Sequence, residues 1–425
     1  MIYKVYRLAT IICSPFIIFY LHRRKKIGKE DYKRINERFG LSTISRPPGR
    51  LIWLHAASVG EAISALELIN KLLTEHLDTR LMMTTGTVSS AKLIRDRLPK
   101  GAFHQFIPID MPNYVRRFME HWQPNIVLWT ESEFWPNIII ETRKRNIPMV
   151  LINGRISAKS FARWKWAPGL IKSLLQSFTL CLGQSDTDVH RLNKLGAFDS
   201  KNLGNLKFAA PPLPADGEVL KTLKSNIGKR PIFLSASTHS GEEEILAIVH
   251  NSLKSKYPNI LSIIIPRHPD RGPEILRAIQ PITANCLLRS NGDIINDLTD
   301  IYVVDTMGEL GLFYRLSEIA FLGKSLVPLG GQNPIEALQL NCAVIHGPYM
   351  TNFQWMSEEM TKLGCSIQIN NSDELIETVS ALLSNNKIRL NMISNGQNFV
   401  KSHSSAVRLV AEEINKILVT QNAGA

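Results

Sequence analysis

The sequence predicts an α/β fold made of two doubly wound, Rossmann-like domains, each with a parallel sheet covered by helices. Three observations lead to this prediction. The chain has 425 residues, more than a single hydrophobic core usually supports. Short apolar runs alternate with amphipathic segments, which is typical of repeated βαβ units. Two similar turns follow apolar runs, one in each half: His55-Ala-Ala-Ser-Val-Gly-Glu61 and Ser237-Thr-His-Ser-Gly-Glu242.

The charge of the chain is concentrated at its N-terminus. Residues 1–50 contain 12 Lys and Arg against 3 Asp and Glu, so they contribute 12 − 3 = +9 to the total of +13 and leave +4 for the remainder. This distribution argues against a nucleic-acid groove across the fold. The 5 cysteines form no close CxxC or CxxH pair, which disfavours a zinc site or a disulfide framework and suits a reducing compartment.

An uncharged run near the N-terminus predicts a membrane anchor over residues 1–28. The run Leu8–Leu21 is shorter than the ~20 apolar residues of a spanning helix and is interrupted by Pro15. A basic cluster, His22–Lys26, follows where a cleaved signal peptide would carry small residues. We therefore expect a monotopic anchor on the cytoplasmic face, with the cluster at anionic head groups. A true span and a helix packed on the protein are the alternatives.

Residues 29–210 are expected to form the first domain. A charged helix is predicted over Lys29–Gly40, and further helices over Glu61–Leu73 and Ser89–Leu98. Ligands of such sheets bind at the carboxyl ends of the strands. The predicted strands are Leu51–Leu54, Arg80–Thr84, His104–Ile109, Ile126–Trp129, Met149–Ile152 and Thr179–Leu182.

Four loops of this domain follow predicted strands and carry polar groups. In the loop His55–Glu61, Gly60 would let a substrate approach the backbone and Glu61 opens a helix, although Glu61 could simply complement the positive helix end. In the loop Trp129–Asn137, two acids lie among aromatic residues, and burying these acids would be costly without partners. The four loops are His55–Glu61, Met83–Thr87, Trp129–Asn137 (with Glu131 and Glu133) and Ile152–Ser157.

Asp186-Thr-Asp188 has the DxD form of a metal motif. It also directly follows Ser185 and opens a predicted helix, so an N-cap with acids in the first turn explains it better than a metal site does. We expect no bound metal and no cofactor.

Residues 211–216 are expected to be a linker, with Lys207 just before it, and residues 217–425 a second domain. Its last predicted helices are Asp373–Leu383 and Ser405–Leu418, and the final helix of such proteins often crosses back to the first domain. The predicted strands are Pro231–Leu234, Ile260–Ile265, Ile301–Val304, Ile319–Leu322 and Ala343–Ile345.

Three loops of the second domain carry groups suited to an anionic ligand. Arg267 lies at a strand end between prolines and suits a phosphate or carboxylate. Asp305–Glu309 is a Gly turn into a helix, where backbone N–H groups favour an anion. In Gly323–Glu336, the Gly330-Gly331 pair would allow close backbone approach. A P-loop is rejected there, because the residue five before Gly323 is Glu318.

Seven of these motifs occur together, in order, in one family. They are His55–Glu61, Thr130-Glu-Ser-Glu-Phe-Trp-Pro-Asn137, Leu151-Ile-Asn-Gly-Arg155, Gly204-Asn-Leu-Lys207, Ser237–Glu242, Pro266-Arg-His-Pro269 and Gly330-Gly-Gln-Asn-Pro-Ile-Glu336. Nearly the whole chain thus resembles the Kdo (3-deoxy-D-manno-octulosonic acid) transferases of lipopolysaccharide assembly. The resemblance implies a GT-B glycosyltransferase in which residues 29–210 bind the acceptor, residues 217–425 bind the nucleotide-sugar, and the two domains face a cleft.

The resemblance also implies an activity and its partners. The enzyme would transfer Kdo from CMP-Kdo to a lipid A precursor (lipid IVA), with inversion and without a metal. It would act at the cytoplasmic side of the inner membrane, held by its N-terminal segment, with no nucleic-acid partner.

By the same resemblance, Glu61 would be the proton acceptor, and Glu131 and Lys207 would stabilise the transition state. The sequence departs from the family at Lys324, where Gly is usual, and at Gln332, where His is usual. The residues implied to contact CMP are Pro266, Arg267, Met307, Gly308, Glu309, Asn333, Pro334, Ile335 and Glu336.

Two other functions remain open at this level. A UDP-sugar epimerase or another lipid-linked sugar transferase would share the fold and would prefer UDP to CMP. A non-catalytic membrane-associated binding protein would explain the basic N-terminus, but the acid-rich loops after the strands argue against it.

Overall fold

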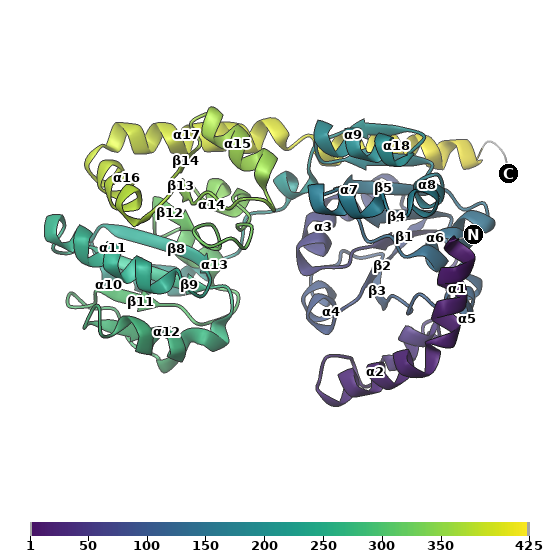
Figure 1. The fold of residues 1–425 in the computed structure, drawn as a ribbon, viewed down its shortest axis with the longest axis horizontal. Helices are drawn as coiled ribbons and strands as arrows, with labels where there is room; N and C mark the ends of the chain where they lie inside the picture. The colour runs from purple at the N-terminus through teal and green to yellow at the C-terminus, as the bar shows by residue number, and fades with distance from the viewer. Residues whose placement is uncertain (1, 423–425) are drawn as a thin grey trace. The chain divides into compact units, whose positions relative to one another are not determined.

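Two parallel sheets of seven strands each organise the chain in the computed structural model, which describes residues 2–422 (Figure 1). Unit 1 comprises Met1–Ala210 together with His403–Ala425, and unit 2 comprises Pro211–Ser402. Each unit contains one sheet with helices on its faces, so the α/β class with two doubly wound sheets is confirmed. The final helix belongs to unit 1 and not to unit 2.

The sheet of unit 1 has the order β3-β2-β1-β4-β5-β6-β7, so β2 and β4 flank β1. Its central strands read as continuous apolar runs because helices cover both faces. The strands are β1 Arg50–His55, β2 Thr79–Thr85, β3 Ala102–Phe106, β4 Ile126–Thr130, β5 Met149–Gly154, β6 Leu180–Gly183 and β7 Ser200–Asn202.

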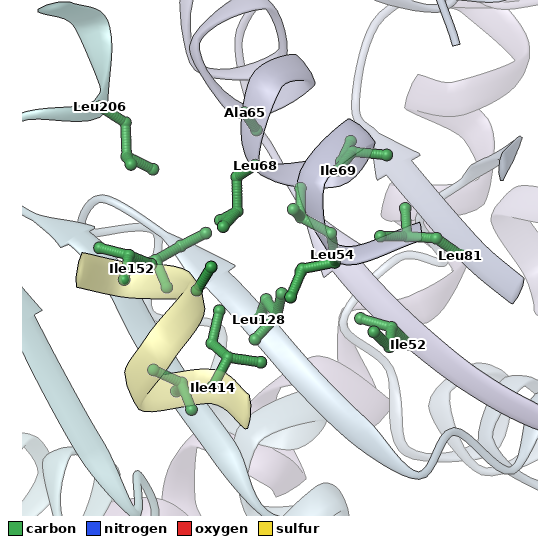
Figure 2. Packing of buried hydrophobic residues seen from close by; sticks show 14 of the residues in the cluster. Ile52, Leu54, Ala65, Leu68, Ile69, Leu81, Leu128, Ile152, Leu206 and Ile414 are labelled. Atoms are coloured by element: carbon green, nitrogen blue, oxygen red, sulfur yellow. The ribbon is translucent and has the colours of Figure 1, made fainter. Parts of the chain in front are cut away.

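Helices of unit 1 form a separate hydrophobic core on each face of the sheet. On one face, Leu68 of α3 and Ile414 of α18 lie over Leu54 and Leu128 of the central strands (Figure 2). On the other face, α5, α6 and α8 cover residues such as Trp129. The helices are α3 Val59–Glu75, α4 Val88–Arg95, α5 Pro112–Trp122, α6 Pro136–Lys144, α7 Ala158–Trp164, α8 Pro168–Leu175, α9 Asp186–Leu195, the 3₁₀ turn η2 Leu206–Ala209, and α18 Ala406–Asn422.

The helix predicted over residues 29–40 is wrong. The segment consists of turns and a short 3₁₀ helix, η1, over Ile35–Phe39. Glu37 is buried and accepts hydrogen bonds from the Arg34 Nε (2.7 Å) and from the N–H of Phe106 at the end of β3 (2.7 Å). These charged residues fasten the segment to the edge of the sheet, so their spacing reflects tertiary partners and not a solvated helix face.

Two helices, α1 (Ile2–Ile12) and α2 (Ser14–Lys26), begin the chain and meet at a bend of 58°. In residues 2–422 we find no individual helix with the length and apolar character to cross a bilayer, and this pair meets those criteria only when its two bent halves are joined. The inner side of α1 is fixed to unit 1, because the Tyr6 hydroxyl donates to the Asp110 carboxylate at 2.9 Å.

Asp110 joins α1 to the start of α6. Its carboxylate also accepts the N–H groups of Asn137 (3.0 Å) and Ile138 (2.8 Å) in the first turn of that helix. Burial raises the pKa of Asp110 to about 6, although these hydrogen bonds oppose the shift. The N-terminal helix is thus part of the folded unit 1.

The sheet of unit 2 has the order β10-β11-β9-β8-β12-β13-β14, so β9 and β12 flank β8. Its strands are β8 Ile232–Thr238, β9 Leu261–Pro266, β10 Cys286–Leu288, β11 Ile301–Val303, β12 Ile319–Leu322, β13 Ala343–His346 and β14 Ser366–Gln368. Its helices are α10 Gly217–Ile227, α11 Glu243–Lys256, α12 Gly272–Ile279, α13 Leu310–Tyr314, α14 Ile335–Gln339, α15 Gln354–Lys362, α16 Ser372–Ser384 and α17 Asn386–His403, with 3₁₀ turns η3 Pro269–Arg271 and η4 Arg289–Asn291.

All the strands predicted from sequence are present, with ends shifted by a few residues. The three strands that were not predicted, β7, β10 and β14, each have 3 residues and lie at sheet edges. An edge strand this short has neither the length nor the full burial that gives a recognisable apolar run.

The helix α18 should contribute substantially to the stability of unit 1. Ile414 of α18 is fully buried in the core that this helix shares with the sheet. Ile414→Ala should therefore lower the free energy of unfolding by about 2–4 kcal/mol in urea denaturation. Val419 lies on the same helix with 62% of its surface exposed, and Val419→Ala should change stability by less than about 0.5 kcal/mol. Equal effects of the two substitutions would contradict the packing described here.

Candidate active site

The carboxylate of Glu61 is held in a hydrogen-bonded pocket at the start of α3. Ser58 caps the helix by accepting the N–H of Glu61 (3.3 Å), and its hydroxyl donates back to the Glu61 Oε1 (2.8 Å). The Oε2 accepts the N–H of Ala57 (3.0 Å) and the hydroxyl of Thr130 from the end of β4. The residue is only 6% exposed, so these contacts fix the carboxylate in one orientation.

The pKa of Glu61 is raised above its ordinary value. Burial is the largest cause, and the negative charge of Glu131 adds to it. The hydrogen bonds from Thr130, Ser58 and Ala57 favour the charged form and partly oppose the shift. The result is a buried carboxylate with an increased affinity for a proton, which suits a general base.

Glu131 reaches this site because of the sheet topology. Glu131 directly follows β4, which pairs with β1 so that Trp129 lies opposite His55. The strand order of the sheet reverses between these two strands, and ligands of such sheets bind at a reversal of this kind. The backbone of Glu131 is left-handed, with φ of 51°. The Glu131 Oε1 accepts a hydrogen bond from the Lys207 Nζ at 2.9 Å. The structure therefore brings Glu61, Glu131 and Lys207 to the same edge of unit 1.

A network of buried amides positions Lys207. The Asn153 Oδ1, at the end of β5, accepts the N–H of Leu206 (3.0 Å), and the Asn205 Oδ1 accepts the N–H of Lys207 (3.0 Å). The Gln184 side chain links the two by donating to the Asn153 carbonyl (3.0 Å) and accepting from the Asn205 Nδ2 (3.1 Å). Gln184 was not predicted as a site residue, although a polar residue directly after the apolar strand β6 was a usable signal.

Two side chains near these loops have structural roles. His55 is fully buried, its ring lies 4.4 Å from that of Trp129, and burial lowers its pKa to about 3. It is therefore neutral near pH 7. Glu133 is exposed, and its carboxylate accepts a hydrogen bond from the Trp135 indole (3.1 Å).

The interpretation of Asp186-Thr-Asp188 as a helix start is confirmed. Ser185 caps α9 by accepting the N–H of Asp188, whose carboxylate accepts the Ser185 hydroxyl (2.7 Å) and the N–H of Ile156 (2.8 Å). Within residues 2–422, no group of three or more His, Cys, Asp and Glu side chains has the arrangement of a metal site.

In unit 2, Glu242 occupies the position that corresponds to Glu61. It follows β8, the strand beside which the order of that sheet reverses. Its fully buried carboxylate accepts the N–H groups of His239 (2.9 Å), Lys324 (2.6 Å), Ser325 (3.0 Å) and Leu326 (3.0 Å). Burial raises its pKa, against these bonds. Glu242 thus shapes the loop after β12.

Arg267 and Arg271 follow β9, beside that loop. The N–H of Arg267 donates to the Thr238 carbonyl at 3.0 Å, which fixes its backbone to the end of β8. Arg271 is paired with the buried Glu243 at 2.9 Å. The guanidinium of Arg267 is exposed and has no ion pair or hydrogen bond among residues 2–422, so its charge is available to a ligand.

The predicted nucleotide contacts at residues 307–309 follow β11. Met307 is 78% exposed, and Gly308 has a left-handed φ of 87°. The carboxylate of Glu309 is paired with Arg289 (2.6 Å) and accepts the Thr306 hydroxyl, and this arginine lowers its pKa. Glu309 therefore already has a cationic partner within unit 2.

The predicted contacts at residues 333–336 surround the start of α14. The Asn333 Nδ2 donates to the Glu336 Oε1 at 3.2 Å, and the Asn333 Oδ1 accepts the N–H of Ile335 at 3.3 Å. Pro334 and Ile335 are buried and anchor this turn. The loop after β12 therefore presents Asn333 and Glu336 as one hydrogen-bonded pair.

Gly330 and Gly331 are required by close packing within unit 2. A Cβ on Gly330 would come within 2.5 Å of the Asn352 side chain, and one on Gly331 within 2.3 Å of the Met350 sulfur. The chain itself therefore fills the space that a side chain would occupy at these two positions. At Gly60, in contrast, no atom outside its chain neighbours and the nearby backbone of α3 lies within 4 Å of the Cβ position.

A hollow of 980 Å³ on unit 2 contains none of the predicted site residues. It lies at the opposite edge of the sheet, where Ile232 begins β8 and Ile319 begins β12. The polar groups described above are instead at the carboxyl ends of the strands, where ligands of such sheets bind.

Comparison with known proteins relates the chain to one family. Residues 33–210 match the family model described as 3-deoxy-D-manno-octulosonic-acid transferase (kdotransferase). A probable mitochondrial 3-deoxy-D-manno-octulosonic acid transferase of Arabidopsis thaliana is 35% identical over 99% of this chain and 94% of its own length. The 3-deoxy-D-manno-octulosonic acid transferase of Rickettsia bellii is 34% identical over 91% of this chain and 92% of its own.

A solved structure confirms the fold class. The UDP-GlcNAc 2-epimerase of Neisseria meningitidis bound to UDP-GlcNAc superposes with a TM-score of 0.61, over 86% of this chain and 100% of the epimerase, at 13% identity. This similarity shows a GT-B-type fold. With the fold, the matched family model and full-length relatives in agreement, the chain belongs to the 3-deoxy-D-manno-octulosonic acid (Kdo) transferase family of glycosyltransferases.

Proposed function

We propose that this protein transfers Kdo from CMP-Kdo to a lipid A precursor, lipid IVA, in an inverting reaction that needs no metal or cofactor. Membership of the Kdo transferase family supports the transferred group. The observation that carries the mechanism is the buried Glu61 carboxylate, whose raised pKa and fixed orientation suit a base. Unit 1 supplies this base, and unit 2 binds the nucleotide.

Glu61 removes the proton of the acceptor hydroxyl. A sugar hydroxyl has a pKa far above 7, so it needs an aligned base as its oxygen bonds to the donor. In one displacement, the acceptor oxygen bonds to the anomeric carbon of Kdo, the bond from that carbon to the CMP phosphate breaks, and the proton passes to Glu61. Attack opposite the leaving group inverts the anomeric carbon.

Lys207 and Glu131 stabilise the transition state as a pair. Kdo carries a carboxylate next to its reacting carbon, and an ammonium group beside that carboxylate offsets its charge during the displacement. The 2.9 Å contact with Glu131 holds the Lys207 ammonium in a defined position. The network of Asn153, Gln184 and Asn205 fixes the backbone of the same turn.

The charge of the departing CMP is met by protein groups in place of a metal. Arg267 offers an unpaired guanidinium at the end of β9, and guanidinium groups bind phosphate strongly. Glu336, whose carboxylate accepts from the Asn333 Nδ2 at 3.2 Å, accepts a ribose hydroxyl of the donor in this proposal. The other proposed CMP contacts lie at the end of β9 or in the segments that follow β11 and β12: Pro266, Met307, Gly308, Glu309, Pro334 and Ile335.

The helices α1 and α2 attach the enzyme to the cytoplasmic side of the inner membrane as a monotopic anchor. Their outer surface exposes Leu8 (57%), Ile12 (65%), Phe16 (77%) and Phe19 (71%), and basic residues in the last turn of α2 suit anionic head groups. The hydrogen bond from Tyr6 to Asp110 keeps α1 on the protein. Anchoring at the surface would bring the enzyme to a lipid-borne acceptor.

Replacement of the base should abolish transfer without affecting nucleotide binding. With CMP-Kdo and a tetraacylated lipid A precursor, product measured by mass spectrometry should fall by about 10²- to 10⁴-fold in Glu61→Gln, while CMP affinity by calorimetry should be unchanged. Glu67→Gln, at an exposed position of the same helix, is the matched control and should retain activity. Substantial transfer by Glu61→Gln would refute its role as base.

The pH profile should report the environment of Glu61. A base acts in its ionised form, so kcat/KM should fall as the pH drops through the raised pKa of Glu61, above the ordinary glutamate range. Thr130→Val removes a hydrogen bond that favours the ionised form, which should raise this pKa and move the acid limb to higher pH. Thr142→Val, buried in α6, should leave the limb unmoved. A limb unaffected by Thr130→Val would mean that another group titrates.

The exposed apolar surface of α1 and α2 should determine membrane binding. The double variant Phe16→Asp, Phe19→Asp should bind vesicles containing an anionic phospholipid at least about tenfold more weakly in flotation assays, because burying each Phe contributes about 1.5–3 kcal/mol. Leu77→Asp, at a position that is 84% exposed before β2, should bind as the wild type does. Unchanged flotation of the double variant would exclude this surface as the anchor.

A further inference from the structure

Lys324 has a backbone conformation that lysine rarely adopts. Its φ is 62°, in the left-handed region that favours glycine. Among residues 2–422, the other non-glycine residues with positive φ fall into two groups. One group follows helices, where a left-handed residue is common: Gln123, Asn146 and Asn341. The other group lies, like Lys324, at the carboxyl ends of strands: Glu131, Asn153 and Ser237.

The backbone contacts of Lys324 do not require a lysine. Its N–H donates to the Glu242 carboxylate at 2.6 Å, and its carbonyl accepts the N–H of Gly331 at 2.8 Å. A glycine at this position would make both bonds and would adopt the same φ without strain. What the strained lysine adds is therefore its side chain, which projects from a backbone fixed on both sides. Strained residues of this kind are concentrated at functional sites.

The side chain of Lys324 joins a group of cations, and the buried Glu242 carboxylate beside them accepts only backbone N–H groups. Lys324 and Arg267 have no side-chain hydrogen bond or ion pair among residues 2–422. Both lie close enough to His239 for their charges to help lower its pKa, to about 4, after the larger effect of burial. The neighbouring Arg271 is neutralised by Glu243. Two uncompensated cations thus border the ring of His239.

His239 contributes an unsatisfied polar atom to the same place. Its Nε2 is buried and has no hydrogen-bond partner, and its ring packs edge-on against His268 with the centroids 5.5 Å apart. Buried polar atoms are normally bonded, and this nitrogen belongs to a ring that is only partly buried, so it is suited to a hydrogen bond with a ligand. The two cations beside it favour an anionic ligand.

We propose that Lys324 is a donor-binding residue of this chain, and that its ammonium, with Arg267 and His239, binds an anionic group of the nucleotide-sugar donor. The inference rests on the proposed function, because CMP-Kdo offers two such groups, a phosphate and a sugar carboxylate. Lys324 binds the donor in addition to the residues that the family resemblance implies. The strain in its backbone is tolerated because glycine could not provide the charge.

The test compares ligands that contain or lack each anionic group. Calorimetry on the full-length protein measures the binding of CMP and cytidine, and steady-state kinetics measure the KM for CMP-Kdo. If the phosphate is the target, Lys324→Met should bind CMP at least about tenfold more weakly, as expected for the loss of a charged hydrogen bond, and should bind cytidine as the wild type does. If the carboxylate is the target, CMP affinity should be unchanged and the KM for CMP-Kdo should rise by a similar factor.

Two further variants separate charge from folding. Lys324→Arg should retain most of the affinity, and Lys221→Met, at an exposed position on α10, should have no effect. Lys324→Gly should lose donor affinity as Lys324→Met does, yet its melting temperature should equal or exceed that of the wild type, because glycine relieves the left-handed strain. Loss of binding with unchanged or raised stability would exclude a merely structural role.

The outcomes distinguish this inference from the function on which it rests. If the wild type binds CMP and transfers Kdo, but Lys324→Met matches it in both CMP affinity and KM, only the role of Lys324 is overturned. If Lys324→Gly melts well below the wild type, the side chain has a structural role and the inference is also overturned. If the wild type binds no CMP, the proposed donor is wrong and the inference falls with it.

Discussion

A reversal of strand order beside one strand governs the site in each unit. In unit 1 the chain adds strands on one side of β1 and then returns to place β4 on the other side, and in unit 2 it does the same around β8 with β12. Loops far apart in sequence therefore meet at the carboxyl edge of the sheet. A buried carboxylate joins them in both cases, since Glu61 accepts from Thr130 and Glu242 accepts from the N–H of Lys324. The hydrogen bonds of these two carboxylates therefore connect the loop after β1 to the loop after β4, and the loop after β8 to the loop after β12, which carry the other polar groups of each site.

The two carboxylates occupy similar positions but differ in what they can do. Glu242 is fully buried, and four backbone N–H groups use its oxygens, so it has no capacity left for a substrate. Glu61 accepts from one backbone N–H and two hydroxyl groups, retains 6% exposure, and lies near the negative charge of Glu131. The Glu242 carboxylate, with all its acceptor sites used, organises a loop, whereas the Glu61 carboxylate retains a small exposed surface and an acceptor site and can exchange a proton. The similar Gly-Glu turns thus predicted the shared position and not the different roles.

The limits of sequence analysis follow from which interactions are local. Apolar periodicity predicted the central strands, because burial on both faces leaves a pattern within a few residues. The same signal is absent from the edge strand β14, and it was misleading at residues 29–40, where Glu37 bonds to the distant Phe106. The motif residues Glu61, Glu131 and Lys207 were predicted individually, and the structure shows that they share one edge. The support from Gln184 could not be predicted in detail, because it depends on side-chain directions in two neighbouring loops.

Backbone strain at the carboxyl ends of strands is a second feature that both units share. Glu131 and Asn153 in unit 1, and Ser237 and Lys324 in unit 2, adopt left-handed backbones that glycine would adopt without cost. Selection for stability alone would favour glycine or asparagine at such positions, as at Asn146 and Asn341 after helices. Asn153 tolerates the left-handed backbone, and its side chain also accepts a hydrogen bond from the turn that carries Lys207. It therefore meets the requirement for stability and the requirement of the site. A glutamate or a lysine lacks that intrinsic tolerance, so charge at these positions comes at the expense of stability, as is common where function constrains a fold.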